Sequence, residues 1–216
     1  MFHDSEMKKM RDYDNSEDVF ISPCDSKITA VGKLEGNIGL QIKGMNYSID
    51  GLLEKIDAED ILSLHHGDYL NFYLSPKDYH RYHSPMDMTV EKVVHIPGKL
   101  YPVNEKYLNK QQNLFIENER VILQCIDNKK RRFYLVFVGA LNVGKIIINK
   151  IPELSTNHTQ EIKVYKPENF ILKKADELGR FEMGSTIVAL FPKNFITPNI
   201  KTGDQIQFAQ SIGKIL

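Results

Sequence analysis

The feature that most constrains the fold of this chain is a succession of short runs rich in β-branched and aromatic residues, separated by turn-forming residues. Runs of about four to eight such residues, bounded by Gly, Pro, Asn or Asp, are typical of β-strands. They predict strands over residues 27–31, 39–42, 69–74, 90–96, 121–126, 132–139, 145–149, 170–173 and 186–191. The sequence therefore predicts a mainly β (α+β) fold with one or two short helices.

Only one stretch has a clear helical pattern. In residues 52–64 the apolar side chains fall near one helix face, which predicts a helix there. Asp127-Asn128-Lys129-Lys130 lies between two apolar runs and predicts a hairpin turn. The basic cluster 129–132 is therefore more simply a solvated turn than a phosphate-binding patch.

Length and charge limit the domain organisation and the partners. The 216 residues contain no clear linker, so we expect a flexible, polar lead-in over 1–17 and a single domain over 18–216. Lys plus Arg and Asp plus Glu both number 28, which gives no overall field that would attract nucleic acid. No apolar run is long enough for a membrane-spanning helix, and the start lacks a signal-peptide pattern. Cys24 and Cys125 lie far apart outside any CxxC motif, which indicates reduced thiols in the cytosol.

Several polar residues beside apolar runs are candidates for chemistry. Asp25 follows a strand-like run and a proline, where it could orient a histidine or cap a turn. His80 and His83 are three residues apart, but no neighbouring side chains complete a ligand set with zinc-site spacing, so we expect no metal. His95 lies in an alternating apolar run and is interpreted as a packed strand residue.

The glycines near two other runs have simple structural interpretations. Gly144-Lys145 lacks the Ser or Thr and the spacing of a phosphate-binding loop, so a turn is the better reading. Gly184-Ser185 opens a strand, where a residue without a Cβ atom permits a positive φ or the close approach of another group.

Taken together, six ordered motifs resemble those of phosphatidylserine decarboxylases, from about Arg11 to the end of the chain. They are Ser22-Pro23-x-Asp25, Asp78-Tyr79-His80-Arg81-Tyr82-His83-Ser84-Pro85, Pro97-Gly98-x-Leu100-x-Pro102-Val103-Asn104, Leu114-Phe115-x-x-Asn118-Glu119-Arg120, Val138-Gly139-Ala140-x-Asn142-Val143-Gly144 and Glu177-Leu178-Gly179-x-Phe181-x-x-Gly184-Ser185-Thr186.

The resemblance implies a proenzyme that cuts its own Gly184–Ser185 bond into a β chain, 1–184, and an α chain, 185–216. Ser185 would become a covalent pyruvoyl group, the cofactor that forms a Schiff base with phosphatidylserine before loss of CO₂ and release of phosphatidylethanolamine. By motif, His83 is the base for self-cleavage, Asp25 its orienting carboxylate, and His80 the proton donor in decarboxylation.

The resemblance also implies a β-sandwich-like fold related to the barrel-sandwich hybrid of biotinyl and lipoyl carriers, and a homodimer. Family members act as peripheral proteins at the cytoplasmic face of the cell membrane. The bacterial members carry an N-terminal membrane-associating segment, and with only ten residues before Arg11 we expect this chain to lack it. We therefore expect a cytoplasmic protein if the short N-terminus is genuine, or contact with lipid through Phe72, Tyr73 and the turn at 129–132.

A few positions depart from the family pattern. Ser26, Met88 and Ala175 stand where glycine is usual, and Asp12 replaces a proline. These changes alter turn preferences and touch no reactive group, so we expect differences of shape with the chemistry kept.

Three alternatives remain open at this stage. The chain could decarboxylate a related phosphoserine lipid, keep Ser185 as the ordinary nucleophile of a hydrolase, or be an unprocessed, non-catalytic β module. Cleavage of the chain and its response to Ser185→Ala distinguish the hydrolase and the non-catalytic module, and a panel of substrates distinguishes the related phosphoserine lipid.

Overall fold

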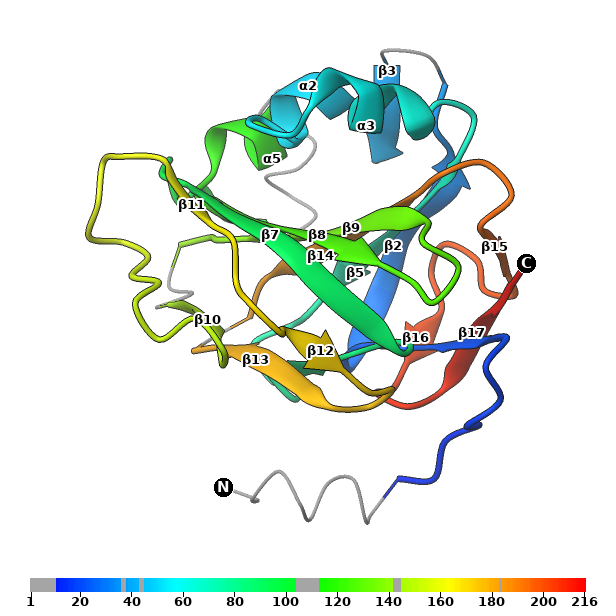
Figure 1. Ribbon diagram of the computed structural model, residues 1–216. Helices are drawn as coiled ribbons and strands as arrows, with labels where there is room; N and C mark the ends of the chain where they lie inside the picture. The colour runs from blue at the N-terminus through cyan, green and yellow to red at the C-terminus, as the bar shows by residue number, and fades with distance from the viewer. Residues whose placement is uncertain (1–10, 36–37, 43–44, 104–112, 142–144, 183) are drawn as a thin grey trace.

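A nine-stranded antiparallel sheet forms the centre of the molecule (Figure 1). The computed structural model describes residues 11–35, 38–42, 45–103, 113–141, 145–182 and 184–216. Along the sheet the order is β11 (Lys163–Tyr165), β7 (Met88–Ile96), β8 (Arg120–Ile126), β9 (Arg132–Val138), β14 (Thr186–Phe191), β5 (Asp68–Tyr73), β2 (Ser26–Lys33) and β16 (Gln205–Ile206), with β12 (Ile171–Leu172) also paired to β7.

Smaller elements cover the faces and edges of this sheet. Two three-stranded sheets have the orders β1 (Val19–Ile21), β17 (Ser211–Ile215), β15 (Ile196–Pro198) and β10 (Ile146–Ile148), β13 (Glu177–Phe181), β6 (Arg81–His83). A hairpin joins β3 (Ile38–Ile42) to β4 (Met45–Ser48). The helices α2 (Ile49–Leu52), α3 (Ala58–Ser63) and α5 (Leu114–Glu117) lie together above the large sheet in Figure 1, and β10 and β13 lie below it.

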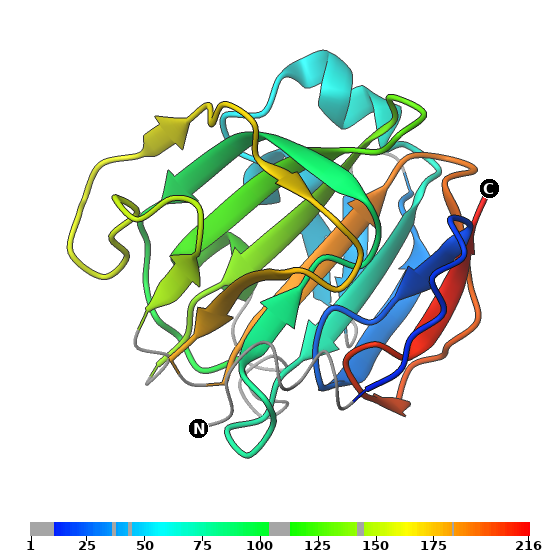
Figure 2. The same cartoon turned by 60° about the horizontal axis from the view of Figure 1, so that its bottom comes forward.

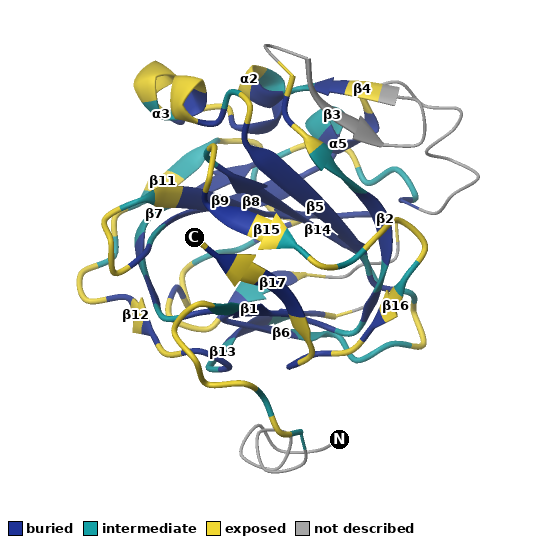
Figure 3. Ribbon diagram, turned by 90° about the vertical axis from the view of Figure 1, so that its right-hand side faces the viewer, coloured by how far each residue is buried: buried dark blue, intermediate teal, exposed yellow. Residues whose placement is uncertain are grey.

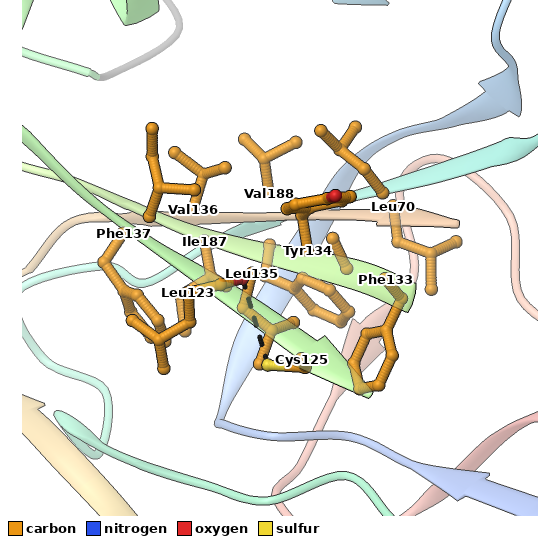
Figure 4. Close-up of a cluster of buried hydrophobic side chains, with 14 of the residues drawn as sticks. Leu70, Leu123, Cys125, Phe133, Tyr134, Leu135, Val136, Phe137, Ile187 and Val188 are labelled. Carbon is orange, nitrogen blue, oxygen red and sulfur yellow. Dashed lines mark hydrogen bonds between the residues drawn. The ribbon is translucent and has the colours of Figure 1, made fainter. Parts of the chain in front are cut away.

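The central strands are buried on both faces. Every residue of β14 and all but the last residue of β8 are buried. Figure 4 shows side chains of β8, β9 and β14 projecting to both sides of the sheet. Because each face is covered, these strands are mostly apolar on both faces, with Arg120 and Gln124 of β8 as buried polar exceptions. Figure 3 shows the contrast with α3, whose outer side is exposed.

The prediction of a mainly β fold is confirmed, and each predicted strand overlaps an observed one. The strands of the large sheet run side by side in Figure 2. The described parts of the chain contain three short helices. The predicted helix over 52–64 is confirmed only in its second half, as α3 (Ala58–Ser63), because α2 ends at Leu52 and α3 begins at Ala58. Between them Lys55 has a left-handed φ of 68°, which stops the helix.

The turn between β8 and β9 is the predicted hairpin. Asp127 accepts hydrogen bonds from the Lys130 and Arg131 amides, at its carbonyl (3.0 Å) and carboxylate (2.7 Å) respectively. Arg131 also pairs with the Asp127 carboxylate, and Arg132 pairs with Asp60 and Glu91. These contacts support the interpretation of the basic cluster as a structural turn.

The described part of the lead-in contacts the domain. Arg11 pairs with Asp25, and the Lys174 ammonium donates to the carbonyls of Asp14 (3.2 Å) and Ser16 (2.6 Å). Residues 1–10 of the predicted lead-in lie outside the described residues.

Some smaller expectations are also resolved. Phe72 is fully buried in β5, so the idea that it meets lipid is wrong. Cys24 and Cys125 are buried free thiols, whose pKa values burial raises. Among the described residues, no helix is both long and apolar enough to cross a membrane.

Candidate active site

The predicted cleavage bond lies where β13 leads into β14. Ser185 is fully buried, its hydroxyl donates to the carbonyl of Val138 at the end of β9, and its own carbonyl accepts from the Leu74 amide (2.8 Å). Next to it, Thr186 pairs with Val138 on one side and with Tyr73 on the other. Ser185 is thus fixed at the end of three adjacent central strands.

Gly184 packs directly against the chain that follows β5. A Cβ atom at Gly184 would lie 2.7 Å from the Leu74 carbonyl oxygen and 2.9 Å from the Pro76 nitrogen. Such distances are too short for any side chain, so the close approach requires glycine. The segment from Leu74 to Pro76 therefore lies against the Gly184–Ser185 linkage.

His83 is positioned by the pairing of β6 with β13, opposite the first residue of β13. β6 pairs antiparallel with β13, with His83 opposite Glu177, and the His83 amide donates to the Pro23 carbonyl (2.8 Å). The side chain is fully buried. These contacts of β6 join three parts of the sequence, around residues 23, 83 and 177–180.

The contacts of the His83 ring fix its tautomer. Nδ1 lies 3.0 Å from the Ala175 carbonyl oxygen, and Nε2 lies 3.1 Å from the Tyr79 hydroxyl. A carbonyl oxygen only accepts, so Nδ1 carries a proton. In the neutral ring Nε2 then holds the lone pair, which accepts from the Tyr79 hydroxyl. This is the state that a general base requires.

Asp25 lies in the same region but bonds to other groups. Its carboxylate accepts two hydrogen bonds from Arg11 and one from the Phe208 amide (2.7 Å). The Phe208 ring stacks on the His83 ring, with centroids 3.7 Å apart and planes 19° apart. Asp25 thus contacts the residue that covers one face of the His83 ring, whose nitrogens contact the Ala175 carbonyl and the Tyr79 hydroxyl.

His80 lies at the start of β6, half-buried. Its carbonyl accepts from the Phe181 amide (2.9 Å), which holds it near the end of β13. Burial lowers the pKa of His80, against the charge of Asp78, which raises it. Its Nε2 atom is buried and has no hydrogen-bond partner among the described residues. A buried polar atom without a partner marks a position where a further group fits.

Four residues around His83 were not predicted as site residues: Arg11, Tyr79, Ala175 and Phe208. Tyr79 belongs to the motif that runs from Asp78 to Pro85, and Ala175 is one of the expected departures from the family pattern, so both had a signal in the sequence. Arg11 and Phe208 reach the site only through tertiary contacts.

The remaining predicted positions have structural roles or lie outside the described residues. His95 is fully buried and its Nε2 lies 2.8 Å from a Glu119 carboxylate oxygen, so it packs within the strand layer as interpreted. Asn142, Val143 and Gly144, in the Gly-Lys turn, are outside the described residues. No group of three or more His, Cys, Asp or Glu suited to a metal is present in the described ranges.

Comparisons with known proteins define the class of the molecule. A sequence model described as phosphatidylserine decarboxylase matches residues 2–214. The phosphatidylserine decarboxylase proenzyme of Campylobacter jejuni is 46% identical over 202 residues, which cover 91% of this chain and 75% of that protein. The proenzyme of Helicobacter pylori strain Shi470 is 43% identical over 211 residues, 96% of this chain and 76% of that protein.

A more distant relative agrees with these. The phosphatidylserine decarboxylase proenzyme of Nitrosospira multiformis is 38% identical over 202 residues, 89% of this chain and 68% of that protein. A mainly β fold with these relatives defines the molecule as an enzyme of the carboxy-lyase class. In particular, the chain belongs to the phosphatidylserine decarboxylase family.

Proposed function

We propose that this chain decarboxylates phosphatidylserine to phosphatidylethanolamine and CO₂, using a pyruvoyl group that it makes from its own Ser185. The observation that carries the proposal is the buried Ser185 and the close packing at Gly184, on the segment that leads to the buried His83, whose Nδ1 lies 3.0 Å from the Ala175 carbonyl oxygen. Family membership supports the substrate.

Self-cleavage begins at the Ser185 hydroxyl. The hydroxyl proton passes to His83 Nε2 as the general base, Oγ attacks the Gly184 carbonyl carbon, and the C–N bond breaks as a proton passes to the leaving amine. The peptide bond is thereby exchanged for an ester. The Nδ1 proton, held on the Ala175 carbonyl, keeps the ring in the required tautomer.

The ester then breaks by elimination. The Ser185 Cα proton leaves to a base, the Gly184 carboxylate departs with the Cβ–O electrons, and the resulting dehydroalanine reacts with water to give ammonia and an N-terminal ketone. Asp25 contributes by fixing Phe208 against the His83 ring. Burial of Ser185 keeps bulk water from competing with the hydroxyl.

The residues near Ser185 fit the group that this chemistry produces. A pyruvoyl group formed from Ser185 would be held by the start of β14 and would supply an electron sink for the charge left when CO₂ departs. The buried Nε2 of His80, which has no hydrogen-bond partner among the described residues, supports a role for His80 in returning a proton to the product.

Substitutions separate the two stages. Ser185→Ala abolishes both cleavage and CO₂ release from carboxyl-labelled phosphatidylserine. His83→Ala slows cleavage by about 100-fold or more, the usual contribution of a general base. His80→Ala leaves cleavage largely intact and suppresses CO₂ release. A His83→Ala chain that splits at the normal rate would refute this division of roles.

The partners and location follow from the proposed substrate. Because phosphatidylserine resides in bilayers, we propose a peripheral enzyme at the cytoplasmic face of the cell membrane, acting as a homodimer. Flotation with phosphatidylserine vesicles and sedimentation equilibrium test the two statements separately. Protein that stays unbound or monomeric under turnover conditions would contradict the corresponding one.

A further inference from the structure

Tyr79 contacts the base nitrogen of His83 and lies on the segment that covers the cleavage bond. We propose that Tyr79 relays the Ser185 hydroxyl proton to His83 during self-cleavage. This proposal rests on the proposed function and adds a residue with a named role to its first step.

The first argument is the contact that the base nitrogen of His83, Nε2, makes with Tyr79. His83 Nδ1 donates to the Ala175 carbonyl, so Nε2 is the atom that can accept a proton, and the Tyr79 hydroxyl lies 3.1 Å from it. The Ser185 hydroxyl donates to the Val138 carbonyl. In the uncleaved chain, the hydroxyl hydrogen-bonded to the base is therefore that of Tyr79.

The second argument is the course of the segment that carries Tyr79. Its first residue, Leu74, is hydrogen-bonded to Ser185, and the next two pack on Gly184. A turn then leads directly to Tyr79. It is closed by two hydrogen bonds, from the Ser75 amide to the Asp78 carboxylate (2.7 Å) and from the Asp78 amide to the Ser75 carbonyl (2.9 Å). One short segment thus joins the cleavage bond to the base.

The third argument is the chemistry of a phenol. A tyrosine hydroxyl both donates and accepts, so it can donate to neutral Nε2 and later accept from the protonated ring. In the relay, Tyr79 receives the Ser185 proton while its own proton moves to Nε2. The new Oγ–C bond to Gly184 forms, the C–N bond breaks, and the proton returns by the same route to the leaving amine. No external reagent is needed.

The charged surroundings of the phenol support this role. The Arg11 guanidinium lies over the Tyr79 ring, 5.9 Å from its centroid, and pairs with Asp25. A cation at this position stabilises the negative charge that develops on the Tyr79 oxygen if its proton moves to Nε2 before the Ser185 proton arrives.

The test is a time course of cleavage after cell-free synthesis of the full chain. Tyr79→Phe keeps the ring and its stacking but removes the proton path, so we expect cleavage at least tenfold slower than in the natural chain. Tyr165→Phe is the matched control, because the buried Tyr165 hydroxyl has no hydrogen-bond partner among the described residues. A Tyr79→Phe chain that splits less than tenfold slower, or faster, would overturn the relay.

A second measurement needs no variant. If two protons move together, the cleavage rate of the natural chain curves downward as the fraction of D₂O rises, whereas a single transfer gives a straight line and overturns the relay. A merely structural role of Tyr79 would not produce the curve. Failure of the natural chain to split would refute the proposed function itself. Normal splitting of both the natural and Tyr79→Phe chains would refute the relay alone.

Discussion

Two alanines beside His83 hold backbone conformations that glycine adopts more readily. Ala175, whose carbonyl fixes the His83 tautomer, has a φ of 66°, and Ala209, next to Phe208, has a φ of 77°. A left-handed conformation costs a residue with a Cβ atom about 1–2 kcal/mol. The site therefore carries backbone strain at both alanines.

Ala175→Gly relieves that strain. We expect it to stabilise the uncleaved Ser185→Ala chain by about 1 kcal/mol, after the larger entropy of glycine in the unfolded chain is subtracted. Urea denaturation measures the change. Ala140→Gly, at a buried position with an ordinary φ, serves as the control and should destabilise the chain. Equal losses from both substitutions would refute the strain.

His80 gives the decarboxylation step a pH dependence. The proton donor must be charged, and burial lowers the pKa of His80 below its ordinary value of 6.5. The turnover rate at saturating substrate should therefore fall as the pH rises through a midpoint below 6.5. His66→Asn, which changes an exposed histidine of left-handed φ, should keep this profile. A midpoint above 6.5 would contradict the assignment.

At the scale of elements, Arg120 joins the helices to the large sheet. Its buried guanidinium donates to the carbonyls of Leu52 (3.0 Å), Gly51 (2.7 Å) and Ile116 (2.5 Å), which belong to α2 and α5. Burial lowers the pKa of Arg120 to about 10, so it stays charged at neutral pH. One side chain thus caps the C-terminal carbonyls of two short helices.

Removal of this guanidinium leaves several buried carbonyls without donors. Arg120→Met should destabilise the Ser185→Ala chain by about 3 kcal/mol. Arg132→Met, which removes two exposed ion pairs on the next strand, should cost less than about 1 kcal/mol. Chemical denaturation of the two variants decides the matter, and similar losses would show that Arg120 does not anchor the helices.

The sequence predicts elements well where one local pattern decides them. The apolar runs of β8, β9 and β14 are long and rich in β-branched residues, so the strands are recognisable without tertiary information. In contrast, β6 is only three residues long and polar at its ends, and it forms because β13 pairs with it from 94 residues further along the chain (Glu177 opposite His83).

The candidate site shows the same limit. Gly184, Ser185, His80, His83 and Asp25 could be selected through motifs, because their residue types suit the chemistry. Other features of the site depend on contacts between segments distant in sequence. These are the hydrogen bonds of Asp25 with Arg11 and Phe208, and the hydrogen bond that the Ala175 carbonyl accepts from His83. No local pattern encodes such contacts.

At the scale of the whole molecule, cleavage would leave the strands of the α chain paired with strands of the β chain. In the uncleaved structure β14 lies between β9 and β5, β16 pairs with β2, and β17 pairs with β1. Each of these neighbours belongs to the β chain. The two chains are therefore expected to remain together without a covalent bond.

This expectation is tested by gel filtration of cleaved protein followed by mass spectrometry. Both chains should elute together in native buffer and separate only under denaturing conditions. The uncleaved Ser185→Ala chain gives the reference elution volume. Loss of the α chain in native buffer would show that β14 depends on the intact linkage to stay in the sheet.

The central claim concerns one peptide bond, and intact mass spectrometry of freshly made protein tests it most directly. The account predicts two chains, 1–184 and 185–216, with the shorter one gaining mass on borohydride reduction of its N-terminal ketone. Ser185→Ala protein should remain whole. A natural chain that stays at 24.9 kDa after long incubation would contradict the account.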